Sequence, residues 1–147
     1  MKLEYLMTYK ADLKPPQEIG KAQFGTRAIY DVTGGTLEGP RLKGKILPSG
    51  GDWILVDDRG VGRLDVRATF ECDDGALIYV QYYGIVVIDP ESGAAESETQ
   101  FGDTYFMTQP RFETSAEDYQ WLNDIVAVGE GRMLPNAVEY KVYQLVN

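Results

Sequence analysis

Charged and apolar side chains alternate along residues 63–70, and this segment carries the chain's most suggestive chemistry. Successive side chains of a strand point to opposite faces, so Arg63, Asp65 and Arg67 share one face. The other face carries Leu64, Val66, Ala68 and Phe70. We predict that Asp65 and Arg67 point into a β-barrel, where Asp65, ionised between two arginines, would orient a substrate. A solvated outer face is the open alternative.

Two further segments carry mixed aromatic and charged faces. Tyr79 shares a face with Gln81 and Tyr83, and a second face contains Tyr105, Met107, Gln109, Arg111 and Glu113. Tyrosine beside arginine and glutamate suits an aromatic or carbonyl-bearing ligand. We predict that Tyr79, Tyr105 and Arg111 bind substrate and that Glu113 acts in catalysis with Asp65 and Arg67. Tyrosine also favours strands, so sheet formation alone is the alternative.

Asp52 and Trp53 follow a pair of glycines, in the run Gly50-Gly51-Asp52-Trp53. We predict that Asp52 is an acid/base group at the mouth of a pocket, with Trp53 as an apolar wall that raises its pKa. The alternative is that Trp53 plugs one end of the core. Asn123 follows a short helix-like segment, where it either caps the helix or hydrogen-bonds a ligand.

The chain contains no histidine and one cysteine, Cys72. These counts exclude Ser-His and Cys-His catalysis, internal disulfides and thiolate clusters for metals. Residues 39–45 match the glycine and lysine positions of a phosphate loop, but Ile46 stands where a magnesium-binding Ser or Thr belongs. The segment also alternates like a strand, whereas a phosphate loop opens a helix. We therefore predict no metal, no nucleotide and no other cofactor.

Composition narrows the class of protein. The chain has 147 residues, 44% of them hydrophobic, which suffices for one folded domain spanning residues 1–147. A net charge of −9 disfavours binding to nucleic acid. The longest purely apolar run is Ile85–Ile88, and the N-terminal segment does not resemble a signal peptide. We predict a cytoplasmic protein that does not bind membranes.

Turn residues recur between short alternating segments, as in an all-β protein. The expected strands cover residues 3–9, 27–33, 41–47, 53–56, 62–71, 76–88, 104–114, 125–128 and 137–145. Turns are expected at Gly34-Gly35, at 48–51 and at Asp73-Asp74-Gly75, a helix at 115–122 and an exposed loop at 89–100. Because so many strands would otherwise leave open edges, we predict a single antiparallel β-barrel of about nine strands with one short helix.

Several of these segments together resemble one family of small bacterial and fungal proteins, the domain-of-unknown-function family DUF3237. The motifs that carry the resemblance are Gly39–Gly44, Gly50–Trp53, Leu64–Arg67, Asp73–Val80, Tyr105-Phe106, Pro110–Thr114 and Trp121–Asn123. The resemblance covers nearly the whole chain, in order, and implies a closed or nearly closed β-barrel. It marks as motif positions Arg41, Asp52, Trp53, Asp65, Arg67, Arg111, Glu113 and Asn123. It implies little about activity.

Carboxylates beside arginine, tyrosine and asparagine suit proton transfer next to a carbonyl group. Our leading hypothesis is a cofactor-independent lyase, cyclase or isomerase for a small aromatic or polyketide-like carbonyl compound held in the barrel. In it, Arg41, Trp53 and Asn123 join the substrate-binding residues. The alternatives are a non-catalytic binding protein and a structural or assembly module. An apolar face left exposed on the barrel would favour a homo-oligomer.

Overall fold

The structure is a computed structural model and describes residues 1–88 and 98–147. Its strands are β1 (Lys2–Leu13), β2 (Gln17–Ala22), β3 (Gly25–Glu38), β4 (Lys43–Val56), β5 (Val61–Cys72), β6 (Leu77–Val87), β7 (Phe106–Glu113), β8 (Ala127–Leu134) and β9 (Ala137–Val146). One 3₁₀ helix, η1 (Glu117–Asp124), lies between β7 and β8. Most of the loop expected at 89–100 lies outside the described residues. In the described parts, no helix is long and apolar enough to span a bilayer.

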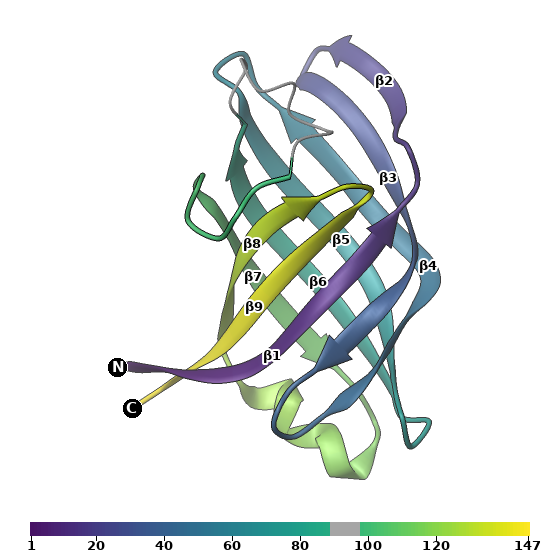
Figure 1. Ribbon diagram of the computed structural model, residues 1–147, viewed down its shortest axis with the longest axis vertical. Coiled ribbons are helices and arrows are strands. Elements are labelled where there is room, and N and C mark those ends of the chain that lie inside the picture. Colours follow the sequence, from purple (N-terminus) through teal and green to yellow (C-terminus); the bar gives the residue numbers. More distant parts are fainter. Residues whose placement is uncertain (89–97) are drawn as a thin grey trace.

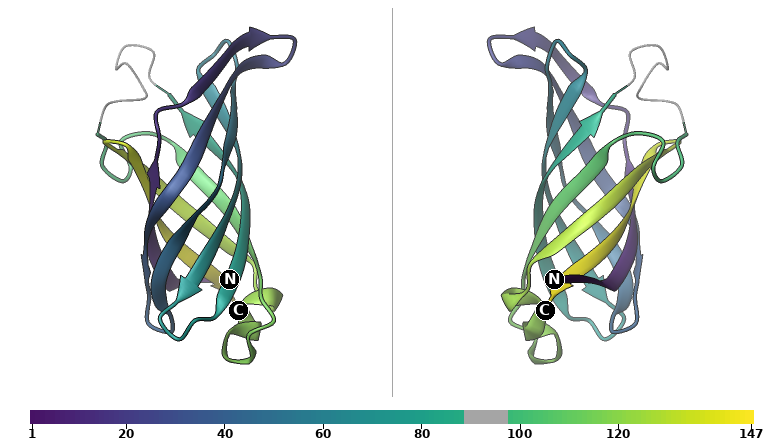
Figure 2. Two further views of the ribbon diagram at one scale, coloured as in Figure 1. Left: turned by 90° about the vertical axis from the view of Figure 1, so that its right-hand side faces the viewer. Right: turned by 90° about the vertical axis from the view of Figure 1, so that its left-hand side faces the viewer.

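The strands form one antiparallel sheet that closes on itself (Figures 1 and 2). Its order is β1-β9-β8-β7-β6-β5-β4-β3-β2, and β1 also pairs with β3 from Thr8↔Glu38 to Leu13↔Val32. Eight strands therefore make the barrel, and β2 extends one edge of β3 beyond it. This confirms the predicted antiparallel barrel with a short helix. The strand β2, which follows Pro15-Pro16, was not expected from the sequence.

Two of the expected turns are instead bulges inside long strands. Gly34-Gly35 lies within β3, and residues 48–51 lie within β4; the β3–β4 register shifts after Asp31 and the β4–β5 register after Ile46. Bulges bend and twist a strand, as closure of a small barrel requires. Gly50 has a φ of 94°, and a Cβ there would lie 2.0 Å from the carbonyl oxygen of Arg67. Glycine therefore permits the bend without ending the strand.

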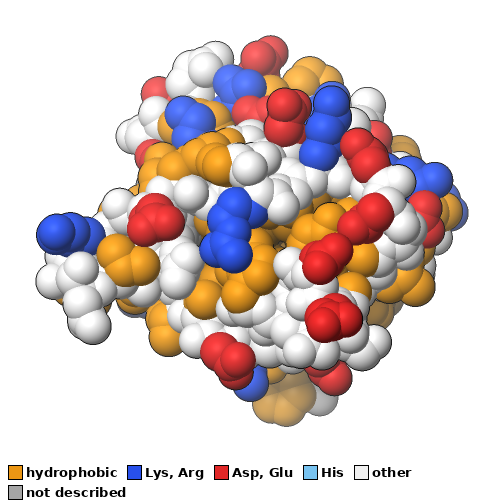
Figure 3. Space-filling view, turned by 90° about the horizontal axis from the view of Figure 1, so that it is seen from below, with side chains coloured by type: hydrophobic (Ala, Val, Ile, Leu, Met, Phe, Trp, Pro, Cys, Tyr) orange, Lys and Arg blue, Asp and Glu red, His pale blue; other side chains and the backbone are white. Residues whose placement is uncertain are grey.

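The 3₁₀ helix η1 lies across the lower end of the barrel (Figure 1). Its Leu122 is fully buried, and the Arg41 guanidinium stacks 3.5 Å from the centre of the Trp121 ring. The Asn123 side chain donates to the carbonyl of Thr114 and accepts from its amide, both at 2.9 Å. Hydrophobic and charged side chains mingle on this end of the molecule (Figure 3). These contacts close the barrel below, so the helix predicted at 115–122 has a structural role.

We predict that Gly50→Ala destabilises the protein more than Gly20→Ala. Both glycines have nearly the same φ, 94° and 93°, so each substitution costs about 1–2 kcal/mol of left-handed strain. Only at Gly50 does the new methyl group also meet backbone; at Gly20 nothing lies within 4 Å. Urea unfolding of both variants measures the difference, which we expect to exceed about 1 kcal/mol. Equal losses would contradict the role assigned to the bulge.

Candidate functional site

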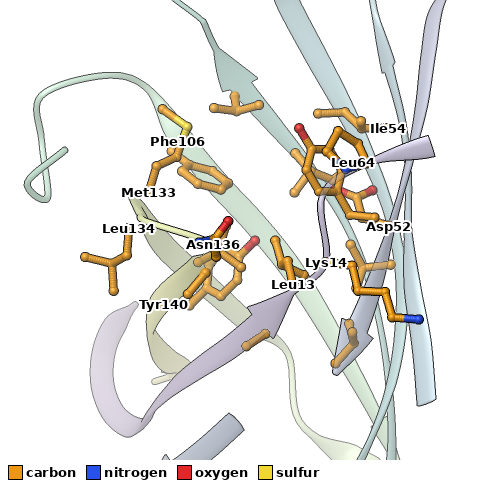
Figure 4. Close-up of a pocket in the computed structure, with 18 of the residues that line it drawn as sticks. Leu13, Lys14, Asp52, Ile54, Leu64, Phe106, Met133, Leu134, Asn136 and Tyr140 are labelled. Carbon is orange, nitrogen blue, oxygen red and sulfur yellow. The ribbon is translucent and has the colours of Figure 1, made fainter. Parts of the chain in front are cut away.

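The upper half of the barrel contains a cavity of about 300 Å³, at the end opposite η1. Its mouth lies where β1 continues into Pro15 and Pro16 and where β8 turns into β9 at Asn136. Most of its lining is apolar and comes from all eight barrel strands: Ala11, Leu13, Val32, Ile54, Leu64, Val66, Val86, Phe106, Met133 and Val138. Figure 4 shows Asp52 and Leu64 on one side and Met133 and Tyr140 on the other.

An aromatic cluster separates this cavity from the packed core below. Tyr82, Phe106 and Tyr140 line the cavity, with Tyr140 5.3 Å from Tyr82 and 5.4 Å from Phe106 between ring centres. Tyr9 packs against Tyr140 from the core side at 5.0 Å and does not line the cavity. The floor of the cavity therefore combines rigid aromatic surface with two phenol groups.

Asp52 is the one carboxylic acid that β4 contributes to the cavity wall. Its Oδ1 accepts a hydrogen bond from the backbone amide of Asp65 at 3.1 Å. Burial is the main cause that raises the pKa of Asp52 from 3.8 to about 7, and the nearby charge of Asp65 also raises it. The hydrogen bond from the Asp65 amide and the positive charge of Arg27 lower this pKa. Near neutral pH, Asp52 is thus present in both protonation states, as a group that gives and takes protons must be.

The phenols around Asp52 stay protonated at neutral pH. Burial raises the pKa of Tyr82 and of Tyr140 well above the ordinary value, and the Asp52 charge adds to both shifts. Tyr30, on β3, lines the cavity as well, and burial and the Asp52 charge raise its pKa. Each phenol therefore keeps its proton, and the hydroxyls of Tyr82 and Tyr140 also interact with each other. The cavity wall brings the Asp52 carboxyl group and these three phenols together in a largely apolar enclosure.

The predicted inward orientation of Asp65 and Arg67 is wrong. On β5 it is Leu64, Val66, Ala68 and Phe70 that are buried, while the Asp65 and Arg67 side chains are 38% and 47% exposed. Their closest charged atoms lie 4.0 Å apart on the outer face. The side chains of a single-layer barrel are shielded from water only on its inner face. Burying apolar groups there stabilises the fold far more than burying an ion pair does.

Most other predicted site residues also lie outside the cavity. Trp53 is on the outer face, 5.7 Å from the Arg67 guanidinium, and is not the wall that raises the pKa of Asp52. Tyr79, Arg111 and Glu113 face outward in neighbouring β6 and β7, and Tyr105 is 56% exposed. Asn123 belongs to η1 at the closed end of the barrel, and Arg41 stacks against Trp121 of the same helix. Of the ten predicted residues, only Asp52 lines the cavity.

Sequence reasoning missed the tyrosines of the cavity. Tyr82 shares its strand face with Ile78 and Val80, and Tyr140 shares one with Val142, all buried. The signal was therefore present: a tyrosine in phase with the most apolar face of a barrel strand points inward. In residues 1–88 and 98–147, no group of three or more His, Cys, Asp or Glu side chains is arranged to hold a metal ion.

Comparisons with known proteins place the whole chain in one group. The family described as "Protein of unknown function (DUF3237)" matches residues 1–145. A UPF0311 protein of Rhodopseudomonas palustris is 30% identical over 154 residues, covering 99% of this chain and 97% of that protein. The crystal structure of a β-barrel like protein from Acinetobacter baumannii is 39% identical with a TM-score of 0.86, covering 99% of this chain and 96% of that one.

A more distant likeness extends to a fungal protein. The crystal structure of an enzyme from Penicillium herquei superposes with a TM-score of 0.74 at 24% identity, covering 99% of this chain and 94% of that one. At this level of identity the likeness shows that the barrel is shared and says nothing about the reaction.

We predict that Asp52→Asn stabilises the protein at pH 8 and has little effect at pH 4. The folded protein holds the Asp52 proton to a higher pH than the unfolded chain, so stability falls as pH rises from about 4 to about 7. Asparagine keeps the acceptor for the Asp65 amide and removes the buried charge. Urea unfolding should give a gain of about 2–4 kcal/mol at pH 8. The exposed Asp58→Asn serves as the control and should show no such pH-dependent gain.

Proposed function

Because this chain belongs to the DUF3237 family and keeps its titratable carboxyl group inside the barrel, we propose that it is an acid/base enzyme working in this cavity. The reaction class is that of a cofactor-independent lyase, cyclase or isomerase. The substrate is a small aromatic or polyketide-like compound with a carbonyl group. The observation that carries the proposal is Asp52, which burial brings to a pKa of about 7 beside the phenols of Tyr82 and Tyr140.

The proposed chemistry is proton transfer at the carbon next to the carbonyl group. The Asp52 carboxylate takes a proton from that carbon, and the electron pair of the C–H bond moves toward the carbonyl oxygen as an enolate. Tyr82 and Tyr140 donate hydrogen bonds to the developing oxyanion. The proton on Asp52 then returns to a different atom of the substrate, which completes an isomerisation, or to a leaving group, which completes an elimination.

The cavity supports an apolar substrate of modest size. Its volume of about 300 Å³ lies at the lower end of ligand pockets, and most of its lining is aliphatic or aromatic. Among the described residues that line it, the charged ones are Asp52 in the wall and Lys14 and Glu18 at the mouth. Lys14 is 63% exposed and lies 3.8 Å from Asp31. A planar aromatic compound whose polar groups meet the phenols fits these surfaces best.

The largely apolar lining also supports a second candidate, a protein that binds such a compound without converting it. A carrier gains affinity from apolar surface and has no use for a carboxyl group that titrates near neutral pH. The pKa of Asp52 therefore favours the enzyme. The two functions differ in whether a bound compound changes.

A panel of aromatic and polyketide-like ketones, assayed for binding and for conversion, tests the proposal. For a converted compound, Asp52→Asn should lower kcat about 100-fold or more while binding persists, because the isosteric amide cannot accept the proton. Tyr82→Phe and Tyr140→Phe should each lower kcat by about 10-fold or more. Glu113→Gln, on the outer face, is the matched control and should keep full activity.

Two outcomes would decide against the enzyme. If the Asp52→Asn variant turns over substrate as fast as the wild type, Asp52 takes no part in the reaction. If every compound that binds in the cavity is released unchanged, the protein is a carrier and not an enzyme.

A further inference from the structure

The wall of the barrel is interrupted beside Asp52. Strands β4 and β5 pair at Asp52↔Val66 and again at Leu55↔Arg63, in one register. Between these points, Trp53 and Ile54 of β4 have no paired partner on β5. A ladder that opens and closes without a register change leaves backbone groups that need other partners.

Two side chains supply those partners. The Asp65 amide, which in a continuous ladder would donate to β4 backbone, donates to the Asp52 carboxylate at 3.1 Å. The Trp53 carbonyl accepts from the Arg27 guanidinium at 2.7 Å instead. The Asp52 side chain thus replaces a backbone group within the sheet, which holds the carboxylate at one place in the cavity wall.

The Asp65 side chain lies at the same interruption, on the outer side. Its Oδ1 is buried and, within the described part of the chain, has no hydrogen-bond partner. Its nearest cation, Arg67, is 4.0 Å away, too far for a hydrogen bond. A buried carboxylate oxygen without a donor is costly, and a second carboxylate close by adds to the cost. A proton on Asp52 relieves that second cost.

We propose that Asp65 is a positioning residue for Asp52, forming with it a carboxyl pair that spans the barrel wall. The Asp65 amide orients the Asp52 carboxylate. The Asp65 carboxylate, from outside, favours the protonated form of Asp52, so that Asp52 can act as a proton donor at neutral pH. The consequence for catalysis rests on the proposed function, whereas the pair itself is a property of the protein without substrate.

The groups that face Asp52 account for its titration. Tyr30 and Arg27 lie on β3, Asp65 on β5, Tyr82 on β6 and Tyr140 on β9. Glu18 of β2 also lines the cavity, and its charge acts on Tyr30. The three phenols are neutral near pH 7. Among the charged groups, Asp65 raises the pKa of Asp52 and Arg27 lowers it, and burial is the largest effect.

The test is the titration of Asp52 in the whole protein, followed by NMR of ¹³C-labelled aspartate side chains. Asp65→Asn keeps the amide and the shape of the side chain and removes one negative charge. We expect the Asp52 midpoint to fall by about 0.5–1 pH unit. Arg27→Gln removes the opposing cation and should raise the midpoint. Asp52→Asn identifies the signal by its loss.

Glu71→Gln is the matched control, because Glu71 is also on the outer face of β5 but pairs with Lys45. It should leave the Asp52 midpoint unchanged. An Asp65→Asn midpoint equal to wild type, or an equal shift in Glu71→Gln, would overturn the proposal. A shift confined to Asp65→Asn and Arg27→Gln supports the pair even if no tested ketone is converted, so this result and the proposed enzyme activity can fail separately.

Discussion

Pairing of β1 with β3 is the interaction on which the rest of the structure depends. The other strands pair with their neighbours along the sheet, and among the described residues only the β1–β3 ladder, from Thr8↔Glu38 to Leu13↔Val32, closes the sheet into a barrel. Once the sheet is closed, every barrel strand has one face toward a common interior and one toward water. Closure also demands sharply bent strands, which is why β3 and β4 carry glycine bulges at Gly34-Gly35 and near Gly50.

A closed single-layer barrel with one end covered leaves a largely apolar cavity at the other end. The aromatic cluster of Tyr9, Tyr82, Phe106 and Tyr140 fills the middle, and η1 closes the lower end. Above this cluster, the Asp52 carboxyl group on the inner face loses much of its contact with water. That loss of solvation is the main cause of the raised pKa of Asp52. The reactivity proposed for the cavity thus follows from how the sheet closes.

Local sequence signals predicted the all-β class, the barrel and the hairpin at Asp73–Gly75, because alternation and turn residues act over a few positions. They also singled out Asp52. They misassigned the faces of β5, because alternation shows that Leu64 and Asp65 face opposite ways without showing which one faces inward. The prediction of turns at Gly34-Gly35 and Gly50-Gly51 was wrong for a related reason. Glycine permits a turn and a bulge alike, and only the long-range pairing of β3 and β4 decides between them.

The outer position of the predicted polar residues does not separate all of them from the cavity. A barrel wall is one strand thick, so a residue that points outward has its own backbone in contact with residues that point inward. Asp65 is outside, yet its amide is bonded to the carboxylate of Asp52 within the wall. Arg27 reaches the same interruption through the carbonyl of Trp53. Charge that would be too costly inside the barrel can therefore act on the cavity from the outer face, where part of its solvation is retained.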